Sequence, residues 1–354
     1  MNKNNIVLLH LSLIYGIGPK SVLKFIKQLF DNYLRDQKNP EINRVDFDLT
    51  QIYDLTVNEF VHKFNFTKNQ ADLLTKGLKE TRLLEEELSL LQKHKIDLLT
   101  ILDQDYPKSL KEIYSPPVVI YCKGEKLKNY GKKIAIVGSR KATSYAQRVL
   151  KKIIPDLISN NFSIVSGGAY GVDTIAHKTA VEFEGKTIVV LGAGLLQPAN
   201  QLNRNFFDEI SKGIGTLVSP FPLLKEADKG TFPARNRIIS GLSSGCLVVQ
   251  AAKKSGALIT AKFALDQGRN VFAVPGNIFE TVSKGCHNLI NQGAKLVADS
   301  NDILEEYGIF NKKEKKDIKQ KKEKTTSKQN LILNSLNDKM SLDELSLKLN
   351  LCLD

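Results

Sequence analysis

Two arginines and an asparagine stand together in one short segment, and their chemistry suits an anionic ligand. Arg235, Asn236 and Arg237 follow the pair Phe232-Pro233 and precede an apolar run, so we expect them near the start of a helix. Free backbone N–H groups at a helix start favour an anion. A guanidinium adds a planar fork that fits phosphate better than a Lys ammonium does, and the chain has only 9 Arg beside 42 Lys. The alternative interpretation is a surface cluster of ion pairs.

Further groups that suit phosphate stand in two glycine turns. Gly138-Ser139-Arg140 follows one apolar run, and Ser166-Gly167-Gly168 follows the next along the chain. Backbone amides in such turns, together with Arg140, can hold isolated phosphates. Arg204 and Lys262 are weaker candidates, chosen for their expected place near the same turns. The candidate ligand-binding residues around these turns are therefore Gly138, Ser139, Arg140, Ser166, Gly167, Gly168, Arg204, Phe232, Arg235, Asn236, Arg237 and Lys262.

The elements that must position these residues are a series of buried strands. Apolar, β-branched runs are expected as strands at 133–137, 162–165, 187–191, 216–218, 246–249 and 271–274. Helical stretches lie between them, so the sequence predicts an α/β fold with a doubly wound, mostly parallel sheet. Such sheets bind ligands at the carboxyl ends of their strands, which is where the glycine turns stand.

The same turns exclude several nucleotide-binding motifs. A dinucleotide site needs G-x-G-x-x-G after the first strand and an acid after the second, and this sequence has neither. It also has no G-x-x-x-x-G-K-[ST] loop and no G-x-S-x-G elbow. We therefore expect no cofactor and no catalytic residue.

Two arrangements of titratable groups have a simpler interpretation than catalysis. Cys286-His287 lacks a third ligand or an orienting acid. Asp173 and His177 stand four residues apart on an expected helix, where a hydrogen bond or a place in a binding loop is commoner than proton transfer. The four cysteines are scattered without a C-x-x-C pair, which is typical of reduced thiols in the cytoplasm. We expect no metal site.

The α/β region resembles the DprA/Smf family, the DNA-processing protein A of natural transformation. The resemblance rests on ordered motifs at 136–140, 166–173, 190–195, 232–239, 255–261, 267–276 and 285–287, within about residues 105–308. It implies a Rossmann-like domain that binds single-stranded DNA, forms a homodimer through that domain and helps to load the RecA recombinase. The family is not known as an enzyme family. The candidate ligand-binding residues then become candidate DNA-binding residues, and replacing Arg140 or Arg235 is expected to weaken binding without unfolding the chain.

Three positions depart from the family pattern. Pro220 stands where an acid is usual, Gln250 replaces a usual Glu, and His287 replaces a usual Asn. The apolar residues after the last motif could supply part of a symmetric dimer interface or could only complete the core; they are Leu289, Ile290, Ala294, Leu296 and Val297.

The charge of the chain agrees with a nucleic-acid partner. Its net charge is +13. Residues 311–328 hold 9 Lys against 3 acids and residues 329–354 hold 2 Lys against 4 acids, so residues 1–310 carry +9. A basic folded region suits phosphate binding, although a Lys-rich composition alone also produces such a charge. No apolar run reaches the ~18 residues of a membrane span, so we expect no membrane association.

Changes in composition and hydrophobic periodicity along the chain predict four regions. Residues 1–105 are expected to form a helical domain that resembles a SAM or helix-hairpin-helix domain, in which the turn Gly16-Ile17-Gly18-Pro19-Lys20 either holds a phosphate or simply joins two helices. The Rossmann-like domain covers 106–308, and a Lys-rich linker covers 309–328. Residues 329–354 resemble an incomplete winged helix, truncated or vestigial, which we do not expect to read duplex DNA.

Two other functions stay open. One is a Rossmann-like nucleotide phosphoribohydrolase, which needs a P-G-G-x-G-T-x-x-E type of loop; residues 275–280 depart from that pattern. The other is a module that binds only protein partners.

Overall fold

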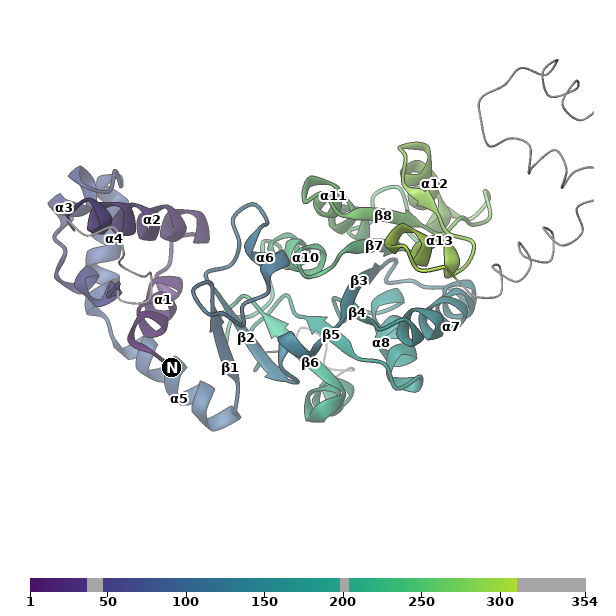
Figure 1. Cartoon of the computed structure of the whole chain (residues 1–354), viewed down its shortest axis with the longest axis horizontal. Helices are drawn as coiled ribbons and strands as arrows, with labels where there is room; N and C mark the ends of the chain where they lie inside the picture. The colour runs from purple at the N-terminus through teal and green to yellow at the C-terminus, as the bar shows by residue number, and fades with distance from the viewer. Residues whose placement is uncertain (37–46, 198–203, 311–354) are drawn as a thin grey trace, which may run out of the picture. The chain divides into compact units, whose positions relative to one another are not determined.

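A nine-stranded sheet forms the centre of the chain (Figure 1). The computed structural model describes residues 1–36, 47–197 and 204–310. Across the sheet the strands lie in the order β1-β2-β6-β5-β4-β3-β7-β8-β9. Their bounds are Asp97–Thr100 (β1), Val119–Gly124 (β2), Lys132–Val137 (β3), Phe162–Ser166 (β4), Thr187–Val190 (β5), Gly215–Ser219 (β6), Gly245–Val248 (β7), Asn270–Ala273 (β8) and Lys295–Leu296 (β9).

The pairing of the strands confirms the predicted doubly wound sheet. The seven strands from β6 to β9 across the sheet pair in parallel, whereas β2 runs antiparallel to both β1 and β6. In the register, Val137 of β3 lies beside Val248 of β7. Every residue of β4, β5, β6 and β7 is buried, which explains why these strands read as continuous apolar runs and not as alternating ones.

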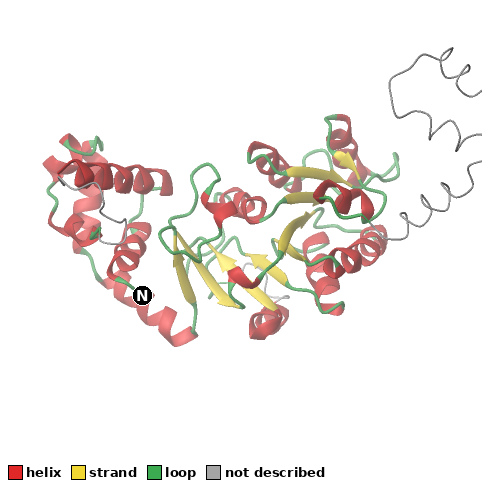
Figure 2. Cartoon of the chain, viewed as in Figure 1, coloured by secondary structure: helices red, strands yellow, loops and turns green. Residues whose placement is uncertain are grey.

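Helices cover both faces of the sheet (Figure 2). Helices α7 and α8 pack against each other, and so do α10 and α11, the two pairs on opposite faces as right-handed crossovers require. In this region the helices are α6 (Lys108–Lys111), α7 (Ser144–Ser159), α8 (Val172–Glu182), α9 (Arg204–Glu209), α10 (Thr231–Leu242), α11 (Ala257–Asp266) and α12 (Lys284–Asn291).

The N-terminal region is helical, as the sequence predicts, but its last residues are not. It contains α1 (Lys3–Leu13), α2 (Pro19–Asp36), α3 (Val57–His62), α4 (Lys68–Lys79) and α5 (Arg82–His94). The aromatic rings of Phe25, Phe60, Phe64 and Phe66 pack together at its centre. Residues 97–100, expected to belong to the helical region, instead form the edge strand β1, because they pair with β2 over their whole length.

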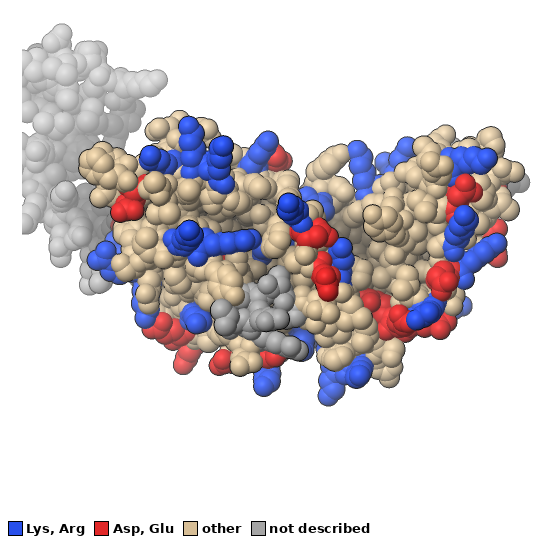
Figure 3. All heavy atoms as spheres, turned by 180° about the vertical axis from the view of Figure 1, so that it is seen from behind, with Lys and Arg blue, Asp and Glu red and all other residues tan. Residues whose placement is uncertain are grey.

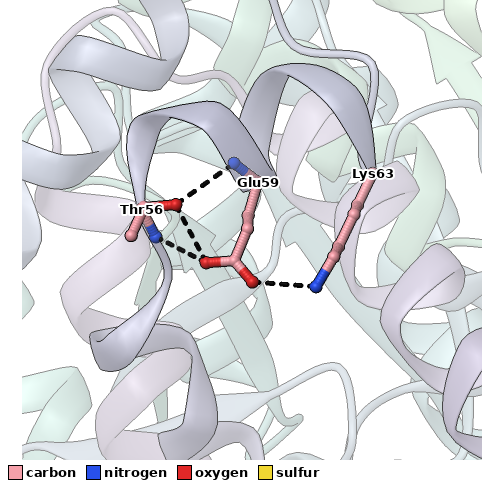
Figure 4. A network of polar contacts seen from close by, with 3 residues as sticks. All are labelled: Thr56, Glu59 and Lys63. Atoms are coloured by element: carbon pink, nitrogen blue, oxygen red, sulfur yellow. Dashed lines mark hydrogen bonds and ion pairs between the residues drawn. The ribbon is translucent and has the colours of Figure 1, made fainter.

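Local capping fixes where these short helices begin. At the start of α3 the Thr56 hydroxyl accepts from the Glu59 backbone N–H at 3.3 Å, and the Glu59 carboxylate accepts from the Thr56 backbone N–H at 3.0 Å (Figure 4). Lys63 donates to the same carboxylate at 2.8 Å. These bonds lower the pKa of Glu59 to about 2. The reciprocal pair satisfies two N–H groups that the helix itself cannot.

Buried polar bonds tie the helical region to the sheet region. The carboxylate of Glu87 on α5 accepts from the backbone N–H of Leu223, after β6, at 2.7 Å. The Asn5 side chain on α1 accepts from the Thr100 hydroxyl of β1 at 3.1 Å. Residues 1–300 accordingly form one compact unit, and the expected domain boundary at 105/106 stays a prediction.

Residues 301–354 are a second unit. In it the structure describes α13 (Asn301–Leu304) and the turn that follows it. The expected winged-helix-like segment (329–354) lies outside the described residues, and so does the expected linker (309–328) apart from its first two residues.

Candidate nucleic-acid-binding site

A cavity lies where the order of the strands reverses. Strand β3 continues through α7 towards β4, whereas its neighbour β7 continues through α11 towards β8 on the other side. Diverging connections of this kind leave a crevice at the carboxyl ends of the two strands. A cavity of ≈ 400 Å³ occupies this place. The candidate residues that line it are Gly138, Ser139, Arg140, Phe232, Arg235 and Asn236.

The exposed cation of this cavity is Arg140, and an aromatic ring lies beside it. Arg140 is exposed, and its guanidinium carbon lies 5.4 Å from the centre of the Phe232 ring. Arg140 forms no ion pair with any residue that the structure describes. A free guanidinium beside an aromatic face offers one partner for a phosphate and one for a base.

Arg235 lines the same cavity but is buried. Only 5% of its surface is exposed, and its Nη1 donates to the backbone carbonyl of Val190 at 2.7 Å. Burial lowers the pKa of Arg235, and the nearby Asp173 carboxylate opposes that effect. The guanidinium also explains Gly167, because a methyl group at that position would overlap it. Arg235 is therefore held inside the protein and does not present its fork to solvent, contrary to the expectation from sequence.

The turn after β4 uses its own groups internally. The Asp173 carboxylate accepts from the backbone N–H groups of Gly167 at 3.2 Å and Ala169 at 3.4 Å. The hydroxyl of Ser166 donates to the Ile136 carbonyl at 2.6 Å. Neither Ser166, Gly167 nor Gly168 lines the cavity. The sequence predicted these three residues as phosphate ligands, but the first two already bind within the protein and all three lie outside the cavity.

The turn after β3 is only partly free. The backbone N–H of Ser139 donates to the Gln250 carbonyl at 2.6 Å, which joins the carboxyl ends of β3 and β7 at the crevice. The Ser139 hydroxyl accepts from the Lys141 backbone N–H at 3.0 Å. Ser139 therefore shapes the wall of the cavity, and Arg140 is the side chain of this turn that can reach a ligand.

Two candidates, Arg237 and Lys262, do not line the cavity, and a third, Arg204, has a side chain outside the described residues. The Nη1 of Arg237 donates to the backbone carbonyls of Tyr114, at 2.9 Å, and Ser115, so this guanidinium braces α10 against the loop before β2. Lys262 is exposed on α11 but does not line the cavity. Arg204 is the first residue of α9, and its side chain lies outside the described residues. The phosphate contacts predicted for these three residues stay predictions without support from the geometry.

The start of α10 already holds an anion, the carboxylate of Asp228. This side chain accepts from the backbone N–H groups of Gly230 at 2.7 Å and Thr231 at 3.0 Å. An ion pair to Lys225, together with these bonds, lowers the pKa of Asp228. The predicted anion site at the helix start is thus filled by the chain itself, and a ligand in the cavity would meet side chains of α10, namely Phe232 and Asn236.

The remaining titratable groups have structural roles. His177 is fully buried, its Nδ1 lies 2.7 Å from the Thr187 hydroxyl, and burial lowers its pKa to about 3. The thiol of Cys286 is buried, and burial raises its pKa to about 11. No group of three or more metal-ligating side chains occurs among the residues that the structure describes.

Two of the three departures from the family pattern have a place in the structure. The Gln250 amide donates to the Thr143 hydroxyl at 2.9 Å, and its oxygen accepts from the Thr143 N–H at 3.0 Å, just before α7. The His287 ring contacts the Gly276 carbonyl at 3.0 Å, which braces the loop after β8. Nothing in the structure explains Pro220.

Sequence reasoning missed the wall of the cavity that belongs to α11. Ser255, Gly256 and Thr260 line it. They belong to the family motif at 255–261. The signal that could have identified them is the polar, glycine-containing segment at the start of the expected helix. A larger cavity of ≈ 990 Å³ lies elsewhere, against α1, α5 and β1, away from the switch point. We place the candidate site at the smaller cavity, because the free guanidinium and the aromatic ring are there.

The molecular surface carries many basic side chains, with acidic side chains among them. Figure 3 shows Lys and Arg side chains along the upper edge of one face, with acidic side chains mostly across its middle and lower parts. A polyanion can approach the basic part of such a surface, although the electrostatic potential is not positive over the whole face.

Known proteins share this fold and these motifs. Residues 97–308 match the family described as DNA recombination-mediator protein A, which is more than half of the chain. The chain belongs to this family. The DNA processing protein DprA of Bacillus subtilis is 42% identical over 212 residues, which cover 60% of this chain and 71% of that protein. DprA of Streptococcus pneumoniae is 42% identical over 213 residues, which cover 60% of this chain and 75% of that protein.

Two solved structures of the family are similar as well. The X-ray structure of DprA from Streptococcus pneumoniae has a TM-score of 0.72 and 32% identity, and the likeness covers 86% of this chain and 99% of that one. DNA processing protein A of Helicobacter pylori, whose single-stranded DNA binding mode has been described, has a TM-score of 0.54 and 28% identity over 60% of this chain and 95% of that one. The resemblance predicted from the motifs is confirmed. Among the described residues, no helix of this family member is long and apolar enough to cross a membrane.

Proposed function

We propose that this chain is a single-stranded DNA-binding recombination mediator. The observation that carries the proposal is the exposed Arg140 guanidinium beside the Phe232 ring at the switch-point cavity. A nucleotide supplies a phosphate for the first group and a base for the second. The side-chain amide of Asn236, which lines the same cavity, adds a donor and an acceptor for a base edge.

The geometry favours a single strand over a duplex. Stacking on Phe232 requires a base whose face is free, and in a duplex that face is covered by the neighbouring base pairs. A cavity of ≈ 400 Å³ is also small for anything wider than one or two nucleotides. Binding without much sequence preference follows, because stacking and phosphate contacts are tolerant of the base.

The biological role that we propose is to protect incoming DNA and to help load the RecA recombinase during natural transformation, in the cytoplasm. The support is membership of the recombination-mediator family and the free, buried state of Cys122, Cys246 and Cys286, which suits a reducing compartment. The test is the rate at which RecA filaments form on single-stranded DNA. The full chain should raise that rate at limiting RecA, and an unchanged rate would contradict the proposed role.

We propose further that the chain acts as a homodimer through its α/β region. Leu289 and Val297 are buried in the core, whereas Ile290 is half-buried and Leu296, on the edge strand β9, is 44% exposed. An apolar side chain on an edge strand suits a symmetric contact. Light scattering at tens of micromolar should give a dimer, and Leu296→Asp should give a monomer while Leu265→Asp, at an exposed leucine on α11, should not. A monomeric wild type would contradict this assembly.

The experiment for the proposed function measures DNA affinity at several salt concentrations. Arg140→Ala should weaken binding of a single-stranded oligonucleotide about tenfold and flatten the plot of log K against log salt by about 0.7, the value for one phosphate contact on a single strand. Arg148→Ala is the matched control, because Arg148 is exposed on α7 and does not line the cavity. Equal affinities and slopes in both variants would overturn the proposal.

A hydrolysis control separates the proposal from the phosphoribohydrolase alternative. Glu280, the acid of the loop that departs from the hydrolase pattern, is exposed and does not line the cavity. We expect no turnover of DNA, ATP or nucleoside monophosphates, with or without Mg²⁺. Turnover that survives repurification and disappears in Glu280→Gln would favour the enzyme.

A further inference from the structure

Two tyrosines near the turn between α1 and α2 expose most of their side chains to solvent, although their rings are apolar. Tyr15 is 94% exposed and Tyr114, in the loop before β2, is 75% exposed. Lys20 lies between the turn and this loop, because its Nζ is 2.7 Å from the Tyr114 hydroxyl and 5.1 Å from the centre of its ring. Lys20 forms no ion pair within the described ranges. We call Tyr15, Gly18, Lys20 and Tyr114 the tyrosine platform.

Neither its φ nor a close neighbour requires a glycine at Gly18, which precedes α2 and accepts the first hydrogen bonds of that helix. Gly16 needs its freedom, since its φ is +86°, but Gly18 does not adopt a left-handed conformation. A side-chain carbon at Gly18 would meet nothing within 4 Å. The bare backbone at Gly18 therefore leaves an open surface beside Lys20, which is what the close approach of a ligand backbone needs.

The tyrosine platform is joined to the helix that carries Phe232. Arg237 of α10 donates to the Tyr114 carbonyl at 2.9 Å, so the loop that presents the Tyr114 ring is fixed to α10. Ser115, the next residue, holds a left-handed φ of 54°, which keeps this loop in a conformation that non-glycine residues rarely adopt. The switch-point cavity and the platform are thus braced by one helix.

We propose that the tyrosine platform is a second contact for single-stranded nucleic acid, which extends the path of the strand beyond the switch-point cavity. Bases stack on Tyr15 and on the open face of Tyr114, and a phosphate passes over Gly18 to Lys20. Interleaved aromatic rings and lysines are the pattern of sequence-tolerant single-strand binding. The inference rests on the proposed function, because it needs a strand that already occupies the cavity.

The experiment compares a short with a long oligonucleotide on the full chain. A strand of about 6 nucleotides can occupy the cavity with only a few nucleotides outside it, whereas one of about 20 is long enough to reach both contacts. The double variant Tyr15→Ala/Tyr114→Ala should bind the long strand about tenfold more weakly and the short strand as well as the wild type does. Lys20→Gln should flatten the salt plot by about 0.7 for the long strand only.

Matched controls separate this surface from a general loss of aromatic or charged groups. Phe183→Ala removes an exposed ring at the end of α8, and Lys93→Gln removes an exposed charge on α5; neither should change binding. Gly18→Ser, which keeps a residue type favoured at the start of a helix, should keep the melting temperature of the wild type and weaken only the long strand.

The outcomes distinguish this inference from the proposed function. A wild-type chain that binds neither strand defeats the proposed function. A wild-type chain that binds both strands, with a double variant that matches it on each, defeats the tyrosine platform alone. Equal losses on both strands, or a loss confined to duplex DNA or to a protein partner, would also overturn the platform as a single-strand contact.

Discussion

The turn after β3 and the turn after β4 both lead from a buried strand into a helix through glycine, yet only the first brings an exposed cationic side chain to the cavity. After β3, the Arg140 side chain is exposed beside Phe232. After β4, the backbone N–H of Gly167 binds Asp173, and Arg235 packs where a side chain on Gly167 would lie. The comparison teaches that a glycine turn and an arginine can form a ligand site or can form the buried support behind one.

The arginines beside the two turns, Arg140 in the first and Arg235 of α10 packed against the second, differ in the same way. Arg140 is exposed, so it can exchange water for a phosphate. Arg235 is 5% exposed and lies beside the buried Asp173 carboxylate, whose pKa burial raises while Arg235 lowers it. Removing Arg235 takes away a cation that favours the ionised form of Asp173, which would keep only its bonds to the Gly167 and Ala169 N–H groups. Replacing Arg140 should therefore weaken DNA binding, whereas replacing Arg235 should lower the stability of the fold.

The largest expected effect comes from Arg235 of α10, which packs against the turn after β4. Arg235→Ala should destabilise the chain by about 2–3 kcal/mol, because it removes the buried charged hydrogen bond to the Val190 carbonyl and the cation that favours the ionised form of Asp173. This replaces the expectation from sequence that Arg235→Ala leaves the fold intact. Chemical denaturation monitored by circular dichroism measures the change, with Arg140→Ala as the control that should stay within ~0.5 kcal/mol of the wild type. Equal stability of the two variants would remove the distinction between the turns.

Acid should act on the same buried region through His177. Its folded pKa of about 3 is below the unfolded value near 6.5, so the unfolded chain binds the proton more readily between these values. The contribution is fully present above pH ~6.5 and is lost as the pH falls towards 3, by at most ~1.4 kcal/mol for each pH unit.

The measurement is the free energy of unfolding at about pH 7 and about pH 5, on either side of the unfolded His pKa, for the wild type and for His177→Asn. The wild type should lose more stability than the variant over this interval. A pH dependence that is the same in both chains would show that His177 is not the group that titrates.

A smaller effect is expected at Gln250, which lies next to the exposed turn. Gln250→Glu restores the residue usual in the family, and its carboxylate would accept from the Thr143 N–H just before α7, where a negative charge is favoured. The Thr143 hydroxyl can turn to donate in place of the lost amide bond. The melting temperature should therefore shift by only a few degrees, equivalent to less than ~1 kcal/mol. A loss above ~2 kcal/mol would mean that the buried amide is required.

The fold could be predicted from the sequence better than the roles of the arginines. The parallel strands were visible as continuous apolar runs, and the motifs singled out Arg140 and Phe232, which the structure places beside the cavity at the switch point. Local pattern could not separate Arg235 from Arg237, because their environments come from distant residues: Val190 is 45 positions from Arg235, and Tyr114 is 123 positions from Arg237. It also could not reveal that Asp228 already fills the start of α10, or that 97–100 pairs as a strand.

The most direct test of the central claim is to locate a bound strand on the protein. An oligonucleotide that carries 4-thiothymidine, crosslinked by light to the full chain and mapped by mass spectrometry, reports the side chains that lie against its bases. We predict adducts on the peptide that contains Phe232, and their loss in Arg140→Ala at DNA concentrations that saturate the wild type but not the variant. Adducts that avoid the cavity altogether and persist unchanged in Arg140→Ala would contradict the account.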